Sequence, residues 1–508
     1  MSRFEKSMLG IFLIVSVAAF SVMMKINWMN GQGDDAIFVD ILENLYTHKY
    51  PKSDLLSTVV DFQSNNVKLL TSEAKEVEKV PLGIKNYNDV NIFHFHFSPI
   101  MWIFSYFNRW FSGEWIWSVI TSISFLGLLF CVYVYCRREQ IGLVLSGLIV
   151  ILISLHPAWN LAVQGQFYTD RLFIFLGFWL MWEIEKEKRS WIRIMVLTIL
   201  SAMIIEKVML MVGALLMGYS ILFKRKYIKE RLTTFILGVI ILGLGVVILK
   251  YYINNHYYSS FLSIAQIENF FKNVWIDQTL RNKFFKFTLV NGVWLLFSLR
   301  SPKKILLTLG CMIPNIFGNI GGAEKIGFYT HYHSIYFPIL IWSGVSGFCT
   351  VWKGNKNFRN QIMITILLVI GSIFSYKSDI KPVSWLKAKQ ALGLYIKKEG
   401  YYKYLSDKNK KWDQIVPRGV TISAPESIWV PLFRNRRIFF YPLGIDDVDY
   451  VILRYDDFSE VKYRGFVSYL GEENAKQADK LLNERMRKDG FDFENTIKFE
   501  GYVIIGRK

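Results

Sequence analysis

Residues Leu232 to Leu249 read LTTFILGVIILGLGVVIL, a stretch without a single charged side chain. About 20 consecutive apolar residues span the hydrocarbon core of a bilayer as a helix. A helix is expected because backbone polar groups in lipid must form their hydrogen bonds within their own segment. Comparable runs are Met8 to Met24, Trp115 to Tyr135 and Tyr332 to Trp352. The sequence therefore predicts a polytopic α-helical membrane protein.

Basic residues collect in short clusters between the apolar runs. The cluster before Leu232 consists of Lys224, Arg225, Lys226, Lys229 and Arg231. Clusters of this kind mark the cytoplasmic ends of membrane helices. This topology explains most of the formal net charge of +19, so we expect no nucleic-acid partner. The prediction is a multi-pass protein of the inner or plasma membrane whose N-terminus is cytoplasmic.

Placing every basic cluster inside gives about eleven crossing helices within residues 1–376. The first is an uncleaved signal anchor, and the others are predicted at residues 115–136, 140–155, 171–184, 191–205, 207–223, 232–252, 286–299, 304–318, 332–352 and 360–376. Phe97 to Phe111 is too short to cross and is expected either to lie in the interface or to re-enter the membrane.

Two long outer loops follow from this topology, residues 26–95 and 251–286. Helix-like stretches are predicted at Ile37 to Tyr46 and Leu55 to Phe62 in the first loop, and an amphipathic interfacial helix in the second. All seven histidines fall in outer loops or at outer helix ends: His48, His94, His96, His156, His256, His331 and His333. We expect a polar site on the outer side.

The tail, residues 377–508, is dense in charge and is predicted to be a small extracytoplasmic α/β domain. Its expected helices are Val383 to Tyr395 and Ala475 to Lys488; its expected strands are Gly419 to Ser423, Arg437 to Tyr441, Tyr450 to Leu453 and Tyr502 to Ile505. About 130 residues can bury a core of their own.

Asp34 and Asp35 follow the first helix directly. A carboxylate just outside the membrane can act as a general base or as a metal ligand. The alternative is a helix N-cap, since Asp favours that position before Ala36-Ile37-Phe38.

His94 and His96 form one His-x-His pair, and His331 and His333 form another. In extended backbone such a pair points both imidazoles to one face, as a metal site requires. The alternatives are local hydrogen bonding at the interface and contact with a lipid phosphate. The sequence does not predict which metal these histidines bind.

Two further pairs of ionisable residues lie at predicted outer helix ends. Asp170 and Arg171 either pair with each other or leave the arginine fork for a phosphate. Glu206 and Lys207 stand between two apolar runs with almost no loop, either as a functional pair or as a simple ion pair.

Short motifs occur across most of the chain: Asp34-Asp-Ala-Ile-Phe38, His96-Phe-Ser-Pro-Ile100, His156-Pro-Ala-Trp-Asn160, Glu206, Pro314-Asn315, His331-Tyr-His333-Ser334, Ile422-Ser-Ala-Pro-Glu426, Arg436-Arg-Ile-Phe-Phe-Tyr-Pro442 and Asp449-Tyr-Val-Ile-Leu453. In these motifs the chain resembles a bacterial membrane-protein family called domain of unknown function 2079. That family is placed among the GT-C-type glycosyltransferases. This chain departs from it in having Lys207 where a second acid is usual, and Asp-Asp-Ala where Asp-Leu-Gly is usual.

The resemblance implies a GT-C-like fold that takes a sugar from a polyprenyl-phosphate carrier on the outer side of the membrane. It also implies that Asp34 or Asp35 is the acidic residue of the first outer loop, with His96 and Glu206 as further site residues. Substrate-binding candidates are His94, His96, Asp170, Arg171, Glu206, Lys207, His331 and His333.

The hypothesis is an inverting glycosyl transfer to an acceptor glycan or lipid. Asp34 or Asp35 would deprotonate the acceptor, and Arg171, Lys207 or His96 would hold the phosphate. The hypothesis allows a divalent metal as a cofactor but does not require one. Two other classes compete with this hypothesis: a transporter or flippase for a lipid-linked or anionic solute, and a non-catalytic membrane scaffold.

Overall fold

The computed structural model describes residues 3–28, 33–61, 91–159, 167–223, 228–253, 264–317, 319–320, 323–324, 331–355, 357–379, 411–454 and 472–508. The chain forms two compact units. Unit 1 consists of Met1–Asn27, Phe93–Phe107 and Glu114–Gln390; unit 2 consists of Trp28–Ile92, Asn108–Gly113 and Ala391–Lys508.

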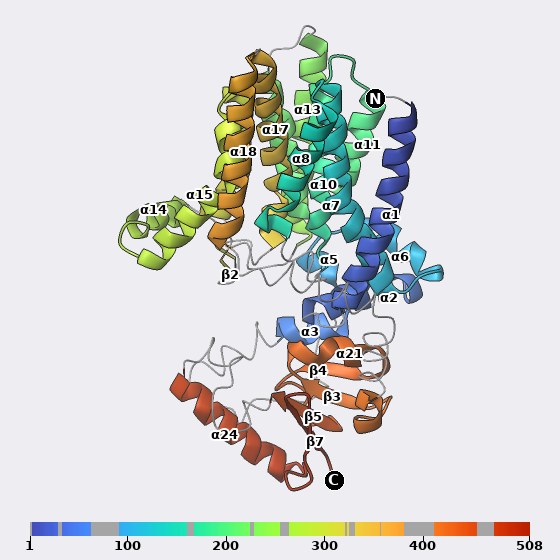
Figure 1. The fold of residues 1–508 in the computed structure, drawn as a ribbon. Coiled ribbons are helices and arrows are strands. Elements are labelled where there is room, and N and C mark those ends of the chain that lie inside the picture. Colours follow the sequence, from blue (N-terminus) through green and yellow to red (C-terminus); the bar gives the residue numbers. More distant parts are fainter. Residues whose placement is uncertain are drawn as a thin grey trace. The chain divides into compact units, whose positions relative to one another are not determined.

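Unit 1 is a bundle of helices (Figure 1). A helix occupies each segment that the sequence predicts to cross the bilayer. The bounds are α1 Arg3–Trp28, α7 Gly113–Arg138, α8 Leu143–Ser154, α10 Leu172–Glu185, α11 Trp191–Ala202, α12 Glu206–Leu222, α13 Ile228–Tyr251, α15 Gln278–Ser298, α16 Pro302–Phe317, α17 Phe337–Gly354 and α18 Phe358–Asp379.

Among the described residues, three helical segments are long and apolar enough to cross a membrane by length and composition. They are Phe4–Lys25 within α1, Gly113–Arg138 and Ile228–Tyr251. Shorter apolar helices are Leu143–Ser154, Trp191–Ala202 and Phe358–Phe374. These helices are compatible with a membrane protein.

The starts of α15 and α17 differ from the predicted crossings by five residues or more. Helix α15 begins at Gln278, eight residues before the predicted 286, because the Asp277 carboxylate accepts hydrogen bonds from the backbone N–H groups of Thr279 at 2.8 Å and Leu280 at 3.3 Å. Helix α17 begins at Phe337, since Pro338 occupies its first turn and a 3₁₀ turn, η8 (His331–Ser334), precedes it.

Short helices occupy the loop segments of unit 1. Helix α14 (Ile264–Asn273) is the helix expected in the second outer loop. The stretch expected in the interface forms only α6 (Ile100–Ser105) and the 3₁₀ turn η4 (Tyr106–Arg109), which are too short to cross a bilayer. The antiparallel pair β1 (Asn319–Ile320) and β2 (Ala323–Glu324) precedes η8.

Helix α17 is the core of unit 1, since every residue from Phe337 to Cys349 is buried. It packs against α10, α15 and α16. Small residues permit the closest approaches: a methyl group on Gly344 would lie 2.9 Å from the carbonyl oxygen of Trp294. One on Gly213 would lie 2.6 Å from the backbone nitrogen of Leu242, where α12 and α13 cross. Small residues serve the same purpose where membrane helices pack together.

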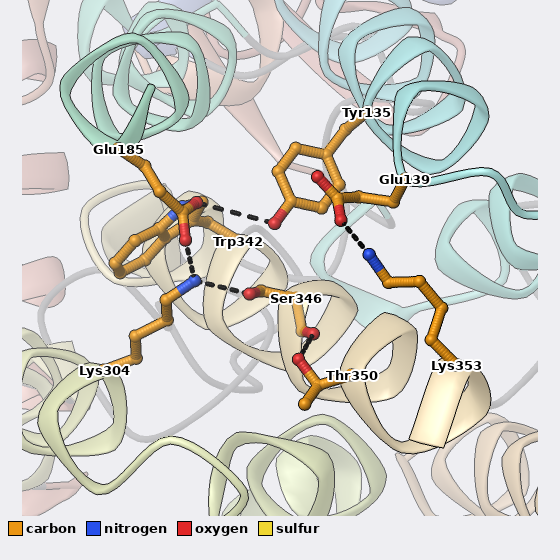
Figure 2. Close-up of polar contacts among 8 residues, drawn as sticks. All are labelled: Tyr135, Glu139, Glu185, Lys304, Trp342, Ser346, Thr350 and Lys353. Carbon is orange, nitrogen blue, oxygen red and sulfur yellow. Dashed lines mark hydrogen bonds and ion pairs between the residues drawn. The ribbon is translucent and has the colours of Figure 1, made fainter. Parts of the chain in front are cut away.

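A network of polar side chains joins α7, α10, α16 and α17 (Figure 2). The Lys304 ammonium contacts the carboxylate of Glu185 and the hydroxyl of Ser346. The same carboxylate accepts hydrogen bonds from the Trp342 indole at 2.9 Å and the Tyr135 hydroxyl at 3.5 Å. A separate pair, Lys353 and Glu139, joins the far ends of α17 and α7. Charges inside the bundle are thus partnered across helices.

Unit 2 is built on a mixed five-stranded sheet of order β4-β3-β5-β7-β6. The strands are β3 Thr421–Ala424, β4 Arg437–Phe440, β5 Tyr450–Arg454, β6 Ile497–Phe499 and β7 Tyr502–Gly506. Strands β3, β4 and β5 are parallel, and β7 runs antiparallel to both of its neighbours. Helix α24 (Glu472–Lys488) buries Leu482 and Met486 against the side chains of β5 and β7.

The four predicted strands and the second predicted helix of the tail are confirmed, and β6 is an additional strand. The other predicted helix, Val383 to Tyr395, lies outside the described residues.

Unit 2 also contains the two helices predicted within residues 26–95, α2 (Gly33–Thr47) and α3 (Asp54–Asp61). Helix α2 packs on the short helix α21 (Trp429–Leu432). Arg434 pairs with Glu43 at 2.8 Å, and the backbone N–H of Phe440 on β4 donates to Thr58 on α3 at 3.1 Å. The sequence prediction assigns this loop to the membrane domain, whereas these contacts group α2 and α3 with the C-terminal strands.

Candidate functional site

Glu206 organises the centre of the candidate site in unit 1. It begins α12, where the helix dipole favours a carboxylate, and it is fully buried. One carboxylate oxygen lies 3.1 Å from Nδ1 of His96, and the other accepts a hydrogen bond from the backbone N–H of Phe97 at 2.9 Å. The His96 side chain is 26% exposed, so this imidazole is accessible while its carboxylate partner is not.

Further hydrogen bonds join the same two segments of chain. The Ser98 hydroxyl donates to the carbonyl of Ile204, and the N–H of Ile100 donates to the carbonyl of Met203 at 3.0 Å. The loop that leads into α6 is therefore attached to the turn between α11 and α12. These bonds fix the imidazole of His96 at the start of α12.

Lys207 follows Glu206 and is 8% exposed. Its ammonium is close enough to the carboxylates of Glu206 and Asp170 to interact electrostatically with both. It also lies 5.1 Å from the centre of the Tyr332 ring. A cation in the first turn of a helix is opposed by the helix dipole, and the two acids and the ring offset that cost.

Asp170 and Arg171 belong to a 3₁₀ turn, η6 (Thr169–Arg171), which packs against η8. Only 2% of Asp170 and 1% of Arg171 is exposed, so the protein encloses both. The Arg171 guanidinium lies 5.4 Å from the ring of Tyr168. The turn thus brings a buried acid and a buried base to the part of the bundle that holds Lys207.

His156 and His333 form a second buried histidine cluster. The backbone N–H of Ala158 donates to Nδ1 of His156 at 3.1 Å, and the imidazole lies 4.7 Å from the ring of Phe337. Burial and the neighbouring imidazole of His333 lower the pKa of His156 to about 3. His156 is therefore neutral at physiological pH and acts as a polar packing group.

The expected geometry of the His-x-His pairs is wrong, because neither pair lies in extended backbone. His94 is in the helical turn α5 (Ile92–Phe95), and His331 and His333 are in η8. Helical backbone turns side chains at i and i+2 to different faces. His94 is exposed, with its ring 4.8 Å from that of Tyr252, while His96 meets Glu206.

The side chain of His331 and all of His256 are outside what the structure describes. Within the described residues, no group of three or more His, Cys, Asp or Glu side chains has an arrangement that could hold a metal ion.

An apolar groove of about 540 Å³ begins at Lys207. Side chains of α12, α13 and α16, together with Ile335, form its walls, and Lys207 is the only residue with a charged side chain among those that line it. The others are Leu210, Met211, Ala214, Leu215, Leu242, Leu249, Leu306, Leu307, Gly310, Cys311 and Pro314. The volume is within the range of small-molecule sites, about 300–1,000 Å³. The groove suits a molecule with a long apolar chain and an anionic head.

The two predicted catalytic acids, Asp34 and Asp35, are in unit 2. Helix α2 begins at Gly33, so both occupy its first turn and neither is the N-cap. Asp35 is 1% exposed, and its carbonyl accepts a hydrogen bond from the Trp28 indole at 3.3 Å. Asp34 is exposed. Of the two, Asp34 is the one that a substrate can reach.

Glu426 is a further acid of unit 2, in the motif Ile422-Ser-Ala-Pro-Glu426, and the sequence does not predict it as a site residue. It lies against α2, where a methyl group on Gly33 would be 2.7 Å from its Cβ. Burial, and then the negative charge of Asp34, raise the pKa of Glu426 to about 7. Asp34 and Glu426 therefore form a carboxylate pair in which one member holds a proton near neutral pH.

The structure thus brings His96 to Glu206 and Lys207 to Asp170, whereas His94 contacts a different partner, Tyr252. The sequence predicts His156 among the polar groups of the outer side, but not its proximity to His333, the contact of Lys207 with Tyr332 or the groove, because contacts between distant segments have no recognisable sequence spacing. Comparison of the chain with models of protein families and with curated proteins finds no match.

Proposed function

We propose that this protein is a GT-C-type membrane glycosyltransferase that takes its sugar from a polyprenyl-phosphate donor. The observation that carries the proposal is the groove with Lys207 at its end. The lining side chains of α12 run from Lys207 to Leu215, about 12 Å along the helix axis. A polyprenyl chain would lie along these residues, and its phosphate would meet the ammonium. The family resemblance supports the same class of enzyme.

In the reaction, an acceptor hydroxyl attacks the anomeric carbon, the bond from that carbon to the phosphate oxygen breaks, and the phosphate leaves with its charge. Lys207 would stabilise this developing charge inside a dry groove, where a fixed cation acts strongly. Arg171, in the turn that brings Asp170 to Lys207, is the second cation of this region.

The proton of the acceptor needs a base. His96 is accessible and its imidazole is oriented by a buried carboxylate, the arrangement of an imidazole general base. Asp34 stays the sequence-based prediction for the same role. The single variants His96→Gln and Asp34→Asn distinguish the two candidates. The variant that lacks the true base should transfer sugar about 10²–10⁴-fold more slowly while its donor binding is unchanged.

The direct test measures binding of polyprenyl phosphate to the purified full-length protein by native mass spectrometry. Lys207→Met should weaken binding by about tenfold or more, the loss of one charge-assisted contact. Lys250→Met is the matched control, since Lys250 is exposed on α13 and does not line the groove. Equal binding by Lys207→Met and the wild type would remove the proposal.

The reaction class is tested with a panel of radiolabelled polyprenyl-phosphate sugars in vesicles. Release of polyprenyl phosphate with sugar on an acceptor supports the transferase. Movement of intact donor across the bilayer would instead establish a flippase. Binding without either would establish a scaffold.

The orientation is tested with single cysteines at Asn65 and Lys410, in a background without the four native cysteines Cys131, Cys136, Cys311 and Cys349. An impermeant thiol reagent should label both in intact cells. Protection of both would place these segments in the cytoplasm, against the outer-face reaction that the family resemblance implies, and would remove the proposed enzyme class.

A further inference from the structure

A second cavity, of about 370 Å³, lies among α1, α7, α10 and α11. Aromatic rings and cations dominate its lining. The rings are Phe130, Phe175, Trp179 and Trp182; the cations are Lys6, Lys186 and Arg193; Leu9, Cys131 and Val134 complete it. No acidic residue is among these lining residues. The cavity therefore combines an apolar wall with a positively charged mouth.

One buried acid partly offsets the three cations. Glu183, 1% exposed, forms an ion pair with Lys186, and its carboxylate lies 3.6 Å from the guanidinium of Arg193. Three cations against one carboxylate leave two positive charges. Glu5, which precedes Lys6 on α1, is engaged by Arg137 at 2.8 Å. Arg193 is 59% exposed and Lys6 is exposed, so both can reach a ligand from the surface.

The charged mouth of this cavity lies at one end of α10, and the apolar groove that begins at Lys207 lies near the other end. Helix α10 begins directly after η6, whose Asp170 interacts with Lys207, and Lys186 follows its last residue, Glu185. Fourteen helical residues extend about 21 Å. In the predicted topology this end is cytoplasmic, and the cytoplasmic leaflet carries the anionic lipids that basic segments attract.

We propose that this cavity binds an anionic phospholipid. An acyl chain lies along the wall formed by Trp179, Phe175 and Phe130, and the phosphodiester lies among Lys6, Lys186 and Arg193. Ammonium and guanidinium groups donate charge-assisted hydrogen bonds to phosphate oxygens. Two excess positive charges favour a headgroup with net negative charge over a zwitterionic one, whose own cation they repel. The apolar wall favours a lipid over a free anion.

The test compares phosphatidylglycerol with phosphatidylcholine of the same acyl chains, using native mass spectrometry of the full-length protein. We expect phosphatidylglycerol to bind about tenfold more tightly. A Lys6→Ala, Arg193→Ala double variant should lose this preference and keep its binding of phosphatidylcholine. The matched control is Lys188→Ala with Lys303→Ala, which removes two exposed charges that do not line the cavity.

A second measurement does not depend on the charge variants. Brominated phosphatidylglycerol should quench the fluorescence of the wild type more than brominated phosphatidylcholine does. Trp179→Phe keeps an aromatic ring in the wall of the cavity. Although the chain has 16 tryptophans, this one substitution should remove much of the difference in quenching between the two lipids. Equal binding of the two lipids, a preference unaffected by the double variant, or displacement of the lipid by inorganic phosphate would each overturn the proposal.

Discussion

Nδ1 of His96 lies 3.1 Å from Oε1 of Glu206, although the two residues are 110 positions apart in the chain. The same carboxylate accepts the backbone N–H of Phe97 at 2.9 Å. A fully buried carboxylate with these partners holds the loop before α6 at the start of α12. Glu206 is therefore both a structural anchor and the group that orients the accessible imidazole.

The first prediction concerns this anchor. Glu206→Gln removes one of two acceptors and should destabilise the loop by about 1.5–3 kcal/mol, the range for hydrogen bonds to a charged group. Amide exchange at Phe97 should accelerate by at least about tenfold. Hydrogen-exchange mass spectrometry measures it, with Glu268→Gln on exposed α14 as the control. Unchanged exchange at Phe97 would show that the carboxylate does not hold this loop.

The second prediction concerns the two ion pairs of Figure 2. The Lys304 side chain is 7% exposed and that of Glu185 29%, so Lys304→Met removes a charged donor from a half-buried carboxylate and should cost about 1.5–3 kcal/mol. Adding Glu185→Gln should recover much of that loss. Lys353→Met is the control, because its pair with Glu139 is 46% and 32% exposed and should contribute about 0–1 kcal/mol. Thermal unfolding in detergent measures the three variants against the wild type, and equal losses for the two lysines would contradict the prediction.

The third prediction concerns the contact between α15 and α17. A methyl group on Gly347 would overlap the carbonyl oxygen of Phe297, and backbone cannot move aside easily. Gly347→Ala should therefore destabilise unit 1 by about 1–3 kcal/mol or more. Gly292→Ala on α15 meets nothing within 4 Å and should stabilise the helix by up to about 1 kcal/mol. The melting temperatures of the two variants should move in opposite directions.

The fourth prediction concerns the pH dependence of unit 2. Burial and Asp34 raise the pKa of Glu426 to about 7 from 4.5. The folded state then binds a proton more tightly than the unfolded state, so this contribution is fully present below about pH 4.5 and is lost as the pH rises through about 7. Asp40, whose pKa is raised to about 7 by burial, acts in the same direction.

Hydrogen exchange in β3 and β5 of the full-length protein should therefore become faster between about pH 5 and about pH 8 by more than the intrinsic chemical effect of pH. The excess should correspond to a decrease in the free energy of unfolding on the order of 1–3 kcal/mol. Glu426→Gln should flatten part of this dependence. Glu494→Gln, at an exposed position, should leave it as in the wild type. A profile that is the same for both variants would mean that Glu426 does not titrate in this range.

The sequence by itself determined the helices of unit 1 and most of the strands of unit 2. Runs such as Leu232 to Leu249 have no other stable structure in lipid, because their backbone groups must pair internally. Alternating or short apolar runs, such as Tyr450 to Leu453, marked the buried strands. Element ends were less certain, since they depend on local caps: Asp277 starts α15 early, and Pro338 starts α17 late.

Only the tertiary structure decided which side chains meet. The resemblance named His96 and Glu206, but the carboxylate's two hydrogen bonds depend on how the turn before α12 folds against a distant loop. The groove needs three helices and Lys207, and no spacing along the chain encodes it. The metal alternative for the His-x-His pairs requires extended backbone, whereas His94 and the segment His331–Ser334 lie in helical turns. Hydrophobic pattern is a local property of the chain, whereas a site is a set of contacts between segments, so the sequence determined the first and only folding determined the second.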